Sequence, residues 1–309
     1  MYMLDVDLPL TIALCTYNGA AYLREQLDSY LSQRHKNWQI WVSDDGSSDT
    51  TLEILDNFGR RHGYHHPLRV IEGPREGVAA NFLSLLCHPD FPAGPVALSD
   101  QDDVWLDHKL SRARAVMEGL TGPVIYGAQS LHVDNTLRTI SRSSTAGSRP
   151  SFGNALVQNV ISGHSCVLSA EALDLVRRAG VPMGVPYHDW WLYLLISGVG
   201  GQVIIDDAPV LLYRQHESNL MGAHRGPRAR IARARQVLRS EYGNWVGANA
   251  AALTTRAQLL DPMARQILED FREPTTGPSR MAQLRRLGIA RQGRLGTACL
   301  YAAAALGRL

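Results

Sequence analysis

Residues 95–105 read PVALSDQDDVW, and this stretch decides the fold class and the chemistry expected of the chain. The apolar run Val96–Leu98 is typical of a short, buried parallel strand. Carboxylates follow it at once on Asp100, Asp102 and Asp103, where such a strand would emerge at the edge of a sheet. Like charges packed this closely are costly without a cation, and Asp-x-Asp at a strand end suits a hard divalent metal. An acidic, solvated turn is the alternative, and the rest of the chain decides between the two.

Strand-like and helix-like segments alternate on both sides of this stretch, which is typical of an α/β protein. Apolar and β-branched runs predict strands at 10–15, 38–42, 68–71, 95–99, 123–126, 165–168 and 202–205. Apolar residues at helical spacing predict helices at 20–33, 49–61, 77–87, 107–120, 151–159 and 188–197. The Ser/Thr/Arg-rich stretch 130–150 predicts a loop.

Charge is divided unevenly along the chain. Residues 222–309 hold 15 arginines, no lysine and five acidic residues, a net charge of +10, so residues 1–221 carry −8 of the overall +2. An acidic body followed by a basic tail favours an anionic surface as the partner of the tail. We therefore expect a main domain over 1–222 and an Arg-rich helical extension over 223–309.

Cysteine usage and hydropathy bear on the compartment. The four cysteines lie far apart and form no Cys-x-x-Cys pair, which favours a reducing compartment over a disulfide framework or a zinc site. No signal peptide is visible, and no stretch reaches the roughly 18–20 apolar residues of a membrane span. We expect a cytoplasmic protein, with contact to the inner face of the plasma membrane left open.

Polar residues gather where the first two strands are expected to end, with Thr16 and Tyr17 after the first and Asp44 and Asp45 after the second. In an open α/β sheet, ligands bind at this edge. The turn CTYNGAAYL lacks the Gly-x-Gly-x-x-Gly of dinucleotide-binding domains, and the chain contains no P-loop. What remains is a nucleotide site built from a polar turn, an acidic turn and a carboxylate cluster.

Several motifs, in order, resemble those of the family 2 glycosyltransferases of the GT-A fold. They are CTYN (15–18), VSDDGSSD (42–49), GPREGV (73–78, without the asparagine usual in the family), DQDD (100–103), NVISGH (159–164) and HDWW (188–191). With YRQH (213–216) they resemble bacterial rhamnosyltransferases, and the Gln-x-x-Arg-Trp signature of the processive synthases is absent. The resemblance implies an α/β, Rossmann-like, mostly parallel sheet flanked by helices, with a C-terminal α-helical extension.

The resemblance also implies which residues hold a nucleotide sugar. They are Thr16, Tyr17, Asn18, Asp44, Asp45, Arg75, Asp100, Gln101 and Arg214. A carboxylate at 44 or 45 matches the imide N–H of uracil or thymine and the ribose hydroxyls, and Arg214 would neutralise phosphate. The alternatives are that Asp45 and Gly46 only shape a turn, and that Arg75 is a solvated side chain.

Metal binding is implied at the acidic cluster. Asp102 is expected to ligate Mg²⁺ or Mn²⁺, with His216 as a further ligand and Asp103 in support. A divalent cation there stabilises the negative charge of a departing diphosphate. A structural role is the alternative for a lone histidine such as His216.

Asp189 occupies the place of the family's catalytic carboxylate. Its apolar neighbours Trp190–Leu192 would exclude water, which raises the basicity of a carboxylate that takes a proton from an acceptor hydroxyl. The alternative is an anion that only interacts with the dipole at the start of its helix. His188 is the weaker candidate base, because no motif supports it.

The expected function is the inverting transfer of L-rhamnose from dTDP-L-rhamnose to a hydroxyl of a surface polysaccharide or other lipid-linked glycan. A UDP-hexose or UDP-N-acetylhexosamine donor is one alternative, and a non-catalytic nucleotide-sugar-binding assembly partner is another. The arginines of the tail favour contact with an anionic membrane, with packing on the main domain as the alternative. No nucleic-acid-binding motif is present, so no nucleic acid partner is expected.

Overall fold

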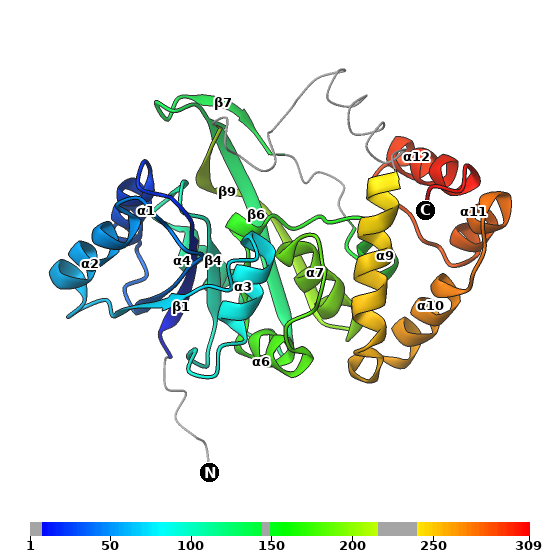
Figure 1. Ribbon diagram of the computed structural model, residues 1–309, viewed down its shortest axis with the longest axis horizontal. Coiled ribbons are helices and arrows are strands. Elements are labelled where there is room, and N and C mark those ends of the chain that lie inside the picture. The colour runs from blue at the N-terminus through cyan, green and yellow to red at the C-terminus, as the bar shows by residue number, and fades with distance from the viewer. Residues whose placement is uncertain (1–7, 144–148, 216–239) are drawn as a thin grey trace, which may run out of the picture.

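The computed structural model describes residues 8–143, 149–215 and 240–309 (Figure 1). Its strands are β1 (Leu10–Thr16), β2 (Trp38–Asp44), β3 (Leu68–Glu72), β4 (Val96–Ser99), β5 (Val104–Trp105), β6 (Val124–Val133), β7 (Thr139–Arg142), β8 (Val167–Leu168) and β9 (Gln202–Arg214). Within the described ranges they form one nine-stranded sheet in the order β3-β2-β1-β4-β8-β6-β9-β5, with β7 beside β6. The longer strands β1–β4, and the pair β6–β9, run parallel, and the short strands β5, β7 and β8 pair antiparallel.

Helices cover both faces of this sheet. One face carries α1 (Leu23–Leu31), α2 (Thr51–His62) and α4 (Lys109–Met117), and the other carries α3 (Val78–Leu86), α5 (Phe152–Ala155), α6 (Ala170–Ala179) and α7 (His188–Gly198). The alternation of side chains along a strand explains the two layers, because Ile12 and Leu14 of β1 pack into one core and Ala13 and Cys15 into the other. The α/β class with flanking helices is therefore as the motifs imply.

Parallel pairing places the ends of the central strands together. β1 lies between β2 and β4, so Thr16 stands opposite Asp44, and Leu14 opposite Ser99. All seven residues of β1 are buried, which fixes its register, because a slip of one residue would exchange its two faces. The three motif-bearing turns after β1, β2 and β4 consequently emerge at one edge.

The second half of the sheet differs from the sequence-based prediction. The strands expected at 123–126 and 202–205 extend much further, as β6 and β9, and the loop predicted for 130–150 is wrong for 130–133 and 139–142. These extensions lack a continuous apolar run. They stay extended because β6 pairs with β9 on one side and with β7 on the other.

A proline inside β9 explains why its length escapes sequence reasoning. Pro209 lies opposite Gln129, where the register between β6 and β9 shifts. Since proline cannot donate to a ladder, it is tolerated within a strand at such an irregularity.

The C-terminal helices are α9 (Ser240–Thr254), α10 (Pro262–Arg272), α11 (Gly277–Arg286) and α12 (Arg294–Ala305), and they lie together beside α7 in Figure 1. They share one hydrophobic core with α5, α6 and α7. The ring of Tyr242 stacks near that of Trp190, and Trp190 Nε1 donates to the carbonyl of Ala155 over 2.7 Å. The extension therefore packs on the main domain along a common apolar surface. Across the described ranges, no helix is long and apolar enough to cross a membrane.

Candidate active site

Two polar side chains join the carboxyl ends of β1 and β2. The Thr16 hydroxyl donates a 2.7 Å hydrogen bond to Asp44 Oδ1. The same carboxylate accepts two hydrogen bonds from Ser47, one of 2.8 Å from the Ser47 backbone N–H and one of 2.6 Å from the Ser47 hydroxyl. Asp44 is thus buried, and it shapes the turn that follows β2.

The turn after β1 is bonded to the turn after β2. The N–H of Asn18 donates to Ser47 Oγ, and the N–H of Ser48 donates to Asn18 Oδ1, both over 2.8 Å. Asn18 has a φ of 48°, a left-handed conformation that asparagine tolerates better than most residues. Tyr17 is 58% exposed, so its ring is available to a ligand at this edge.

Gln101 binds the first turn to the acidic loop. Its Oε1 accepts from the N–H of Tyr17 over 2.9 Å, and its Nε2 donates to the Tyr17 carbonyl over 3.0 Å. A Cβ at Gly19 would lie 2.2 Å from Gln101 Oε1, so this close approach requires glycine. The turns predicted to bind a nucleotide sugar are therefore held side by side.

Asp45 organises the turn that contains Arg75. Its carboxylate accepts from the backbone N–H of Arg75 over 2.6 Å and from that of Gly77 over 3.0 Å. Arg75 has a φ of 61°, and its Nε lies 3.1 Å from where a Cβ of Gly46 would be. Its backbone is fixed, while its exposed side chain stays at the edge of the site.

The acidic loop contains a group suited to a metal ion. One ligand atom each from Asp100, Asp103 and His164 lie within 4.8 Å of one another. Within the described part of the chain, the buried Asp103 Oδ2 has no hydrogen-bond partner. An orphaned carboxylate oxygen beside a second carboxylate and an imidazole fits a divalent cation.

Electrostatics agree with this fit. Burial, together with the charges of Asp102 and Asp189, raises the pKa of Asp100 to about 7. Burial and the neighbouring Asp102 and Asp100 also hold the pKa of Asp103 well above its usual value. Desolvation, together with the charge of Lys109, lowers the pKa of the half-buried His164 to about 3, so its imidazole is neutral, as a metal ligand requires. Among the described residues, the charge of Lys109 opposes the rise in the pKa of Asp100 and Asp103 but does not cancel it.

Lys109 is a basic side chain that the described part of the chain places beside the group. Its buried Nζ donates to the carbonyl of His164 over 2.6 Å and lies 3.4 Å from the centre of the Trp105 ring. Desolvation lowers the pKa of Lys109 well below its usual value, against the opposing charges of Asp103 and Asp100. Lys109 thus fixes the position of the His164 backbone.

Arg214, at the end of β9, anchors the acidic loop. Its guanidinium is 1% exposed and donates to the Asp102 carbonyl over 3.2 Å and to Glu25 Oε2 over 2.6 Å. A further 3.1 Å bond reaches the carbonyl of Asn135, and its backbone N–H donates to Asp103 Oδ1 over 3.4 Å. These bonds show that Arg214 positions the acidic loop, and its contact with phosphate stays a prediction.

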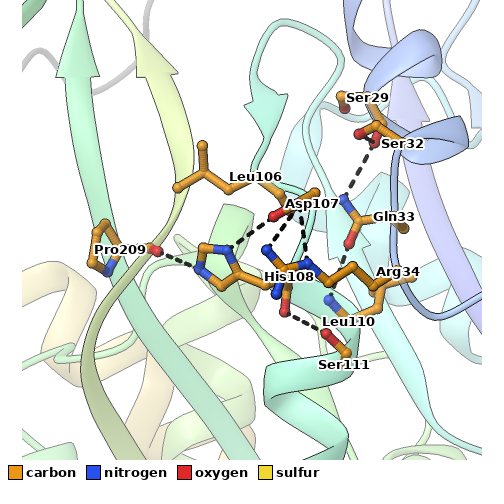
Figure 2. A network of polar contacts seen from close by, with 10 residues as sticks. All are labelled: Ser29, Ser32, Gln33, Arg34, Leu106, Asp107, His108, Leu110, Ser111 and Pro209. Atoms are coloured by element: carbon orange, nitrogen blue, oxygen red, sulfur yellow. Dashed lines mark hydrogen bonds and ion pairs between the residues drawn. The ribbon is translucent and has the colours of Figure 1, made fainter.

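Figure 2 shows how the segment after the acidic loop is fixed. Gln33, just beyond α1, donates to the Leu106 carbonyl over 2.8 Å and accepts from the Leu110 N–H over 3.1 Å. On the other side, His108 Nε2 lies 3.0 Å from the carbonyl oxygen of Pro209 in β9. The segment after the acidic loop is therefore attached to β9 on one side and to the residue Gln33, just beyond α1, on the other.

The expected base, Asp189, lies at the start of α7 and near the acidic group. Its Oδ2 accepts from the Gly163 N–H over 3.0 Å, and its Oδ1 accepts from the Trp190 N–H over 2.7 Å. Because Gly163 directly precedes His164, the bond from Gly163 places Asp189 beside the group of Asp100, Asp103 and His164, and the charge of Asp189 also raises the pKa of Asp100. The fold thus brings Asp189 to the acidic group across 89 residues of sequence.

The outcome differs for Asp102 and His216, the two metal ligands expected from the motifs. Asp102 is partly buried beside the group of Asp100, Asp103 and His164, but it is not one of the three residues whose ligand atoms converge. Its role as a ligand stays a prediction. His216 lies outside the described residues.

His164 and Lys109 escaped the sequence analysis. His164 ends the NVISGH motif, and its position in a motif at a turn is the signal that could have singled it out. Lys109 lies in an ordinary helical pattern, so only its burial beside the carboxylates reveals it.

We expect a pH effect on stability from His188. Its ring is buried and stacks on that of Phe82, with the two ring centres 4.1 Å apart. Desolvation lowers the pKa of His188 below 6.5, so the unfolded chain takes up its proton first as pH falls. The free energy of unfolding should drop below about pH 6.5, by at most about 1.4 kcal/mol per pH unit for one proton. Urea unfolding between pH 7.5 and 5 should show a shallower drop for His188→Gln than for the wild type. The exposed His65→Gln serves as control, and equal slopes in all three proteins would refute the assignment.

The comparisons with known proteins agree with this geometry. The sequence model of glycosyl transferase family 2 matches residues 11–173. The chain therefore belongs to glycosyl transferase family 2, it is a glycosyltransferase, and its fold is GT-A. The family expected from the motifs is confirmed.

Among relatives, the dTDP-rhamnosyl transferase RfbG of Shigella flexneri is 26% identical over 253 residues, which are 78% of this chain and 84% of that protein. The S. aureus TarS 1–349 structure in complex with UDP-GlcNAc superposes with a TM-score of 0.55 at 14% identity, over 96% of this chain and 90% of that one. The mannosyltransferase PcManGT from Pyrobaculum calidifontis, in complex with GDP-Man and Mn2+, superposes with a TM-score of 0.52 at 19% identity, over 97% of this chain and 86% of that one. These two structures share the fold with this chain.

Proposed function

We propose that this protein is an inverting, metal-dependent glycosyltransferase that moves L-rhamnose from dTDP-L-rhamnose to a hydroxyl of a lipid-linked glycan or growing surface polysaccharide. The observation that carries the chemistry is that Asp189 accepts a hydrogen bond from the N–H of Gly163, directly before His164, whose ligand atom converges with those of Asp100 and Asp103. The similarity to a dTDP-rhamnosyl transferase supports the choice of donor.

The cation would be Mg²⁺ or Mn²⁺, held by Asp100, Asp103 and His164, with Asp102 and His216 as the ligands that the motifs imply. The carboxylate oxygens are hard ligands of the kind these ions prefer. When bound, the cation supplies positive charge for the diphosphate of the donor.

The nucleotide is expected along the joined turns of β1 and β2. Tyr17 offers an exposed ring there, Gln101 holds its backbone in place, Asn18 joins the turn to Ser47, and Thr16 holds Asp44. Asp44 and Asp45 already accept bonds from the protein, so they would contact the nucleoside with their remaining lone pairs. Arg75 is expected at the rim of this pocket.

Asp189 acts as the base. Its carboxylate takes the proton of the acceptor hydroxyl, the acceptor oxygen forms a bond to the anomeric carbon, and the bond from that carbon to the diphosphate breaks on the opposite face. The products are the inverted glycoside and the free nucleoside diphosphate. The bonds from Gly163 and Trp190 N–H groups hold the carboxylate in one orientation for this transfer.

A donor panel tests this function. Release of nucleoside diphosphate is measured with dTDP-L-rhamnose, dTDP-glucose, UDP-glucose, UDP-N-acetylglucosamine and GDP-mannose, each with and without Mn²⁺. We expect dTDP-L-rhamnose with Mn²⁺ to turn over at least about tenfold faster than the others, within the range that pocket contacts provide. Turnover of UDP sugars alone would overturn the rhamnosyl assignment, and binding without turnover of any donor would indicate a non-catalytic partner.

A further inference from the structure

The outward side of α12 is apolar, although it faces solvent. Leu295 and Leu306 are 65% and 63% exposed, and Ala298 and Ala302 between them are exposed as well. Their spacing of three, four and four residues places all four on one side of the helix, here called the α12 face. A surface helix normally carries polar residues in these positions.

The opposite side of α12 already holds the helix in place. Leu300, Ala303 and Ala304 are completely buried in the core that the C-terminal helices share with α5–α7. The α12 face is therefore not needed for packing within the described chain, and its apolar character requires another explanation.

Positive charge surrounds the α12 face. Residues 277–309 contain six arginines and no acidic residue. Arg285 at the end of α11 and Arg294 at the start of α12 are exposed, and so is Arg286, which also pairs with Glu273 over 3.8 Å. The guanidinium of Arg285 lies 5.1 Å from the centre of the Tyr301 ring on α12, so this charge stands beside the helix. Apolar side chains with arginines at their border fit an anionic surface.

We propose that the α12 face docks on a bilayer of anionic lipids, with Leu295 and Leu306 entering the headgroup region and Arg285, Arg286 and Arg294 near lipid phosphates. A second copy fits less well, because a symmetric contact through α12 would bring the arginines of both copies together. This inference rests on the proposed function, since it names the surface that carries a lipid-linked acceptor.

The position of α12 in the molecule suits docking on a bilayer that carries the acceptor. In Figure 1, α12 lies at the upper right, and β1 and β6 run upward toward the same side of the molecule. The motif-bearing turn after β1 emerges at the carboxyl end of that strand, together with those after the parallel strands β2 and β4. A bilayer along this side would present a lipid-linked hydroxyl toward the site.

Vesicle flotation of the full chain tests the proposal. We expect the wild type to float with vesicles containing phosphatidylglycerol, to remain unbound with phosphatidylcholine alone, and to be released by salt. Leu295→Gln/Leu306→Gln should reduce the bound fraction at least about tenfold, and each of Arg285→Gln and Arg294→Gln should weaken partitioning about fivefold. The matched controls are Met263→Gln, an exposed apolar residue of α10, and Arg60→Gln, an exposed arginine of α2.

The outcomes separate the possible failures. Absence of flotation by the wild type, or equal flotation of the leucine variant and the controls, would overturn the docking surface. A change from dimer to monomer in the leucine variant, seen by light scattering without lipid, would assign the face to a second copy instead. Hydrolysis of the donor without vesicles is measured in parallel: if it persists while flotation fails, only the surface is wrong, and if flotation succeeds without any hydrolysis, the enzymatic proposal is wrong.

Discussion

Asp189→Asn is expected to lower the turnover of sugar transfer by at least about a hundredfold and to leave donor binding nearly unchanged. Removal of a positioned base costs roughly 10²–10⁴ in rate. An amide cannot take the acceptor proton, but its oxygen can still accept from the Gly163 N–H that now binds Asp189 Oδ2. The substitution therefore removes the basicity while it keeps much of the local geometry.

Steady-state kinetics and donor titration by calorimetry measure the two quantities separately. Asp174→Asn, at an exposed carboxylate of α6 that pairs with Arg178 on the same helix, serves as the matched control and should behave as wild type. Transfer by Asp189→Asn at the wild-type rate would remove Asp189 from the role of base. An equal loss of donor affinity and rate would instead assign this carboxylate to binding.

Asp103→Asn is expected to abolish metal-dependent turnover and, without metal, to make the protein more stable. The buried carboxylate of Asp103 has an orphaned Oδ2, and burial beside Asp102 and Asp100 raises its pKa well above the usual value. Charge held there destabilises the metal-free fold at neutral pH, because the ionised form is desolvated among like charges. A neutral amide removes that cost and also removes a ligand oxygen.

Thermal unfolding in EDTA and in Mn²⁺ measures both consequences. In EDTA the variant should unfold about 3 °C or more above the wild type, which corresponds to roughly 1 kcal/mol for a chain of this size. Mn²⁺ should raise the Tm of the wild type and hardly change that of the variant. Asp56→Asn, at an exposed carboxylate of α2, is the control. A variant that gains as much from Mn²⁺ as the wild type does would exclude Asp103 as a ligand.

The parts of the fold that could be predicted from the sequence are those whose signals are local. β1 and β2 are apolar runs that end in recognisable turns, and parallel pairing then brings Thr16 to Asp44 without further information. β5 has only two residues, too few for a pattern. The outer halves of β6 and β9 are held by pairing, which a window of sequence does not contain.

The same distinction applies to the site. The Asp-x-Asp loop and Asp189 could be recognised from motifs, but the partners that hold them come from elsewhere in the chain. Lys109 binds the His164 carbonyl 55 residues away, and Arg214 binds Glu25 across 189 residues. For Arg214, charge alone suggests phosphate binding, and only its burial reveals that it supports the loop.

The pairing of β5 has a consequence for the order in which the molecule is built on the ribosome. Val104 and Trp105 follow the acidic loop directly, and their ladder partners are Leu212 and Leu211 of β9, more than a hundred residues later. Synthesis proceeds from the N-terminus and domains fold as units, so the turns of β1 and β2 can form while this partner is still untranslated. A nascent chain stalled before residue 211 should hold the turns after β1 and β2 but lack the pairing of β5 with β9 that follows the acidic loop. Fragments that end at residue 173, where the family match ends, would share that deficiency.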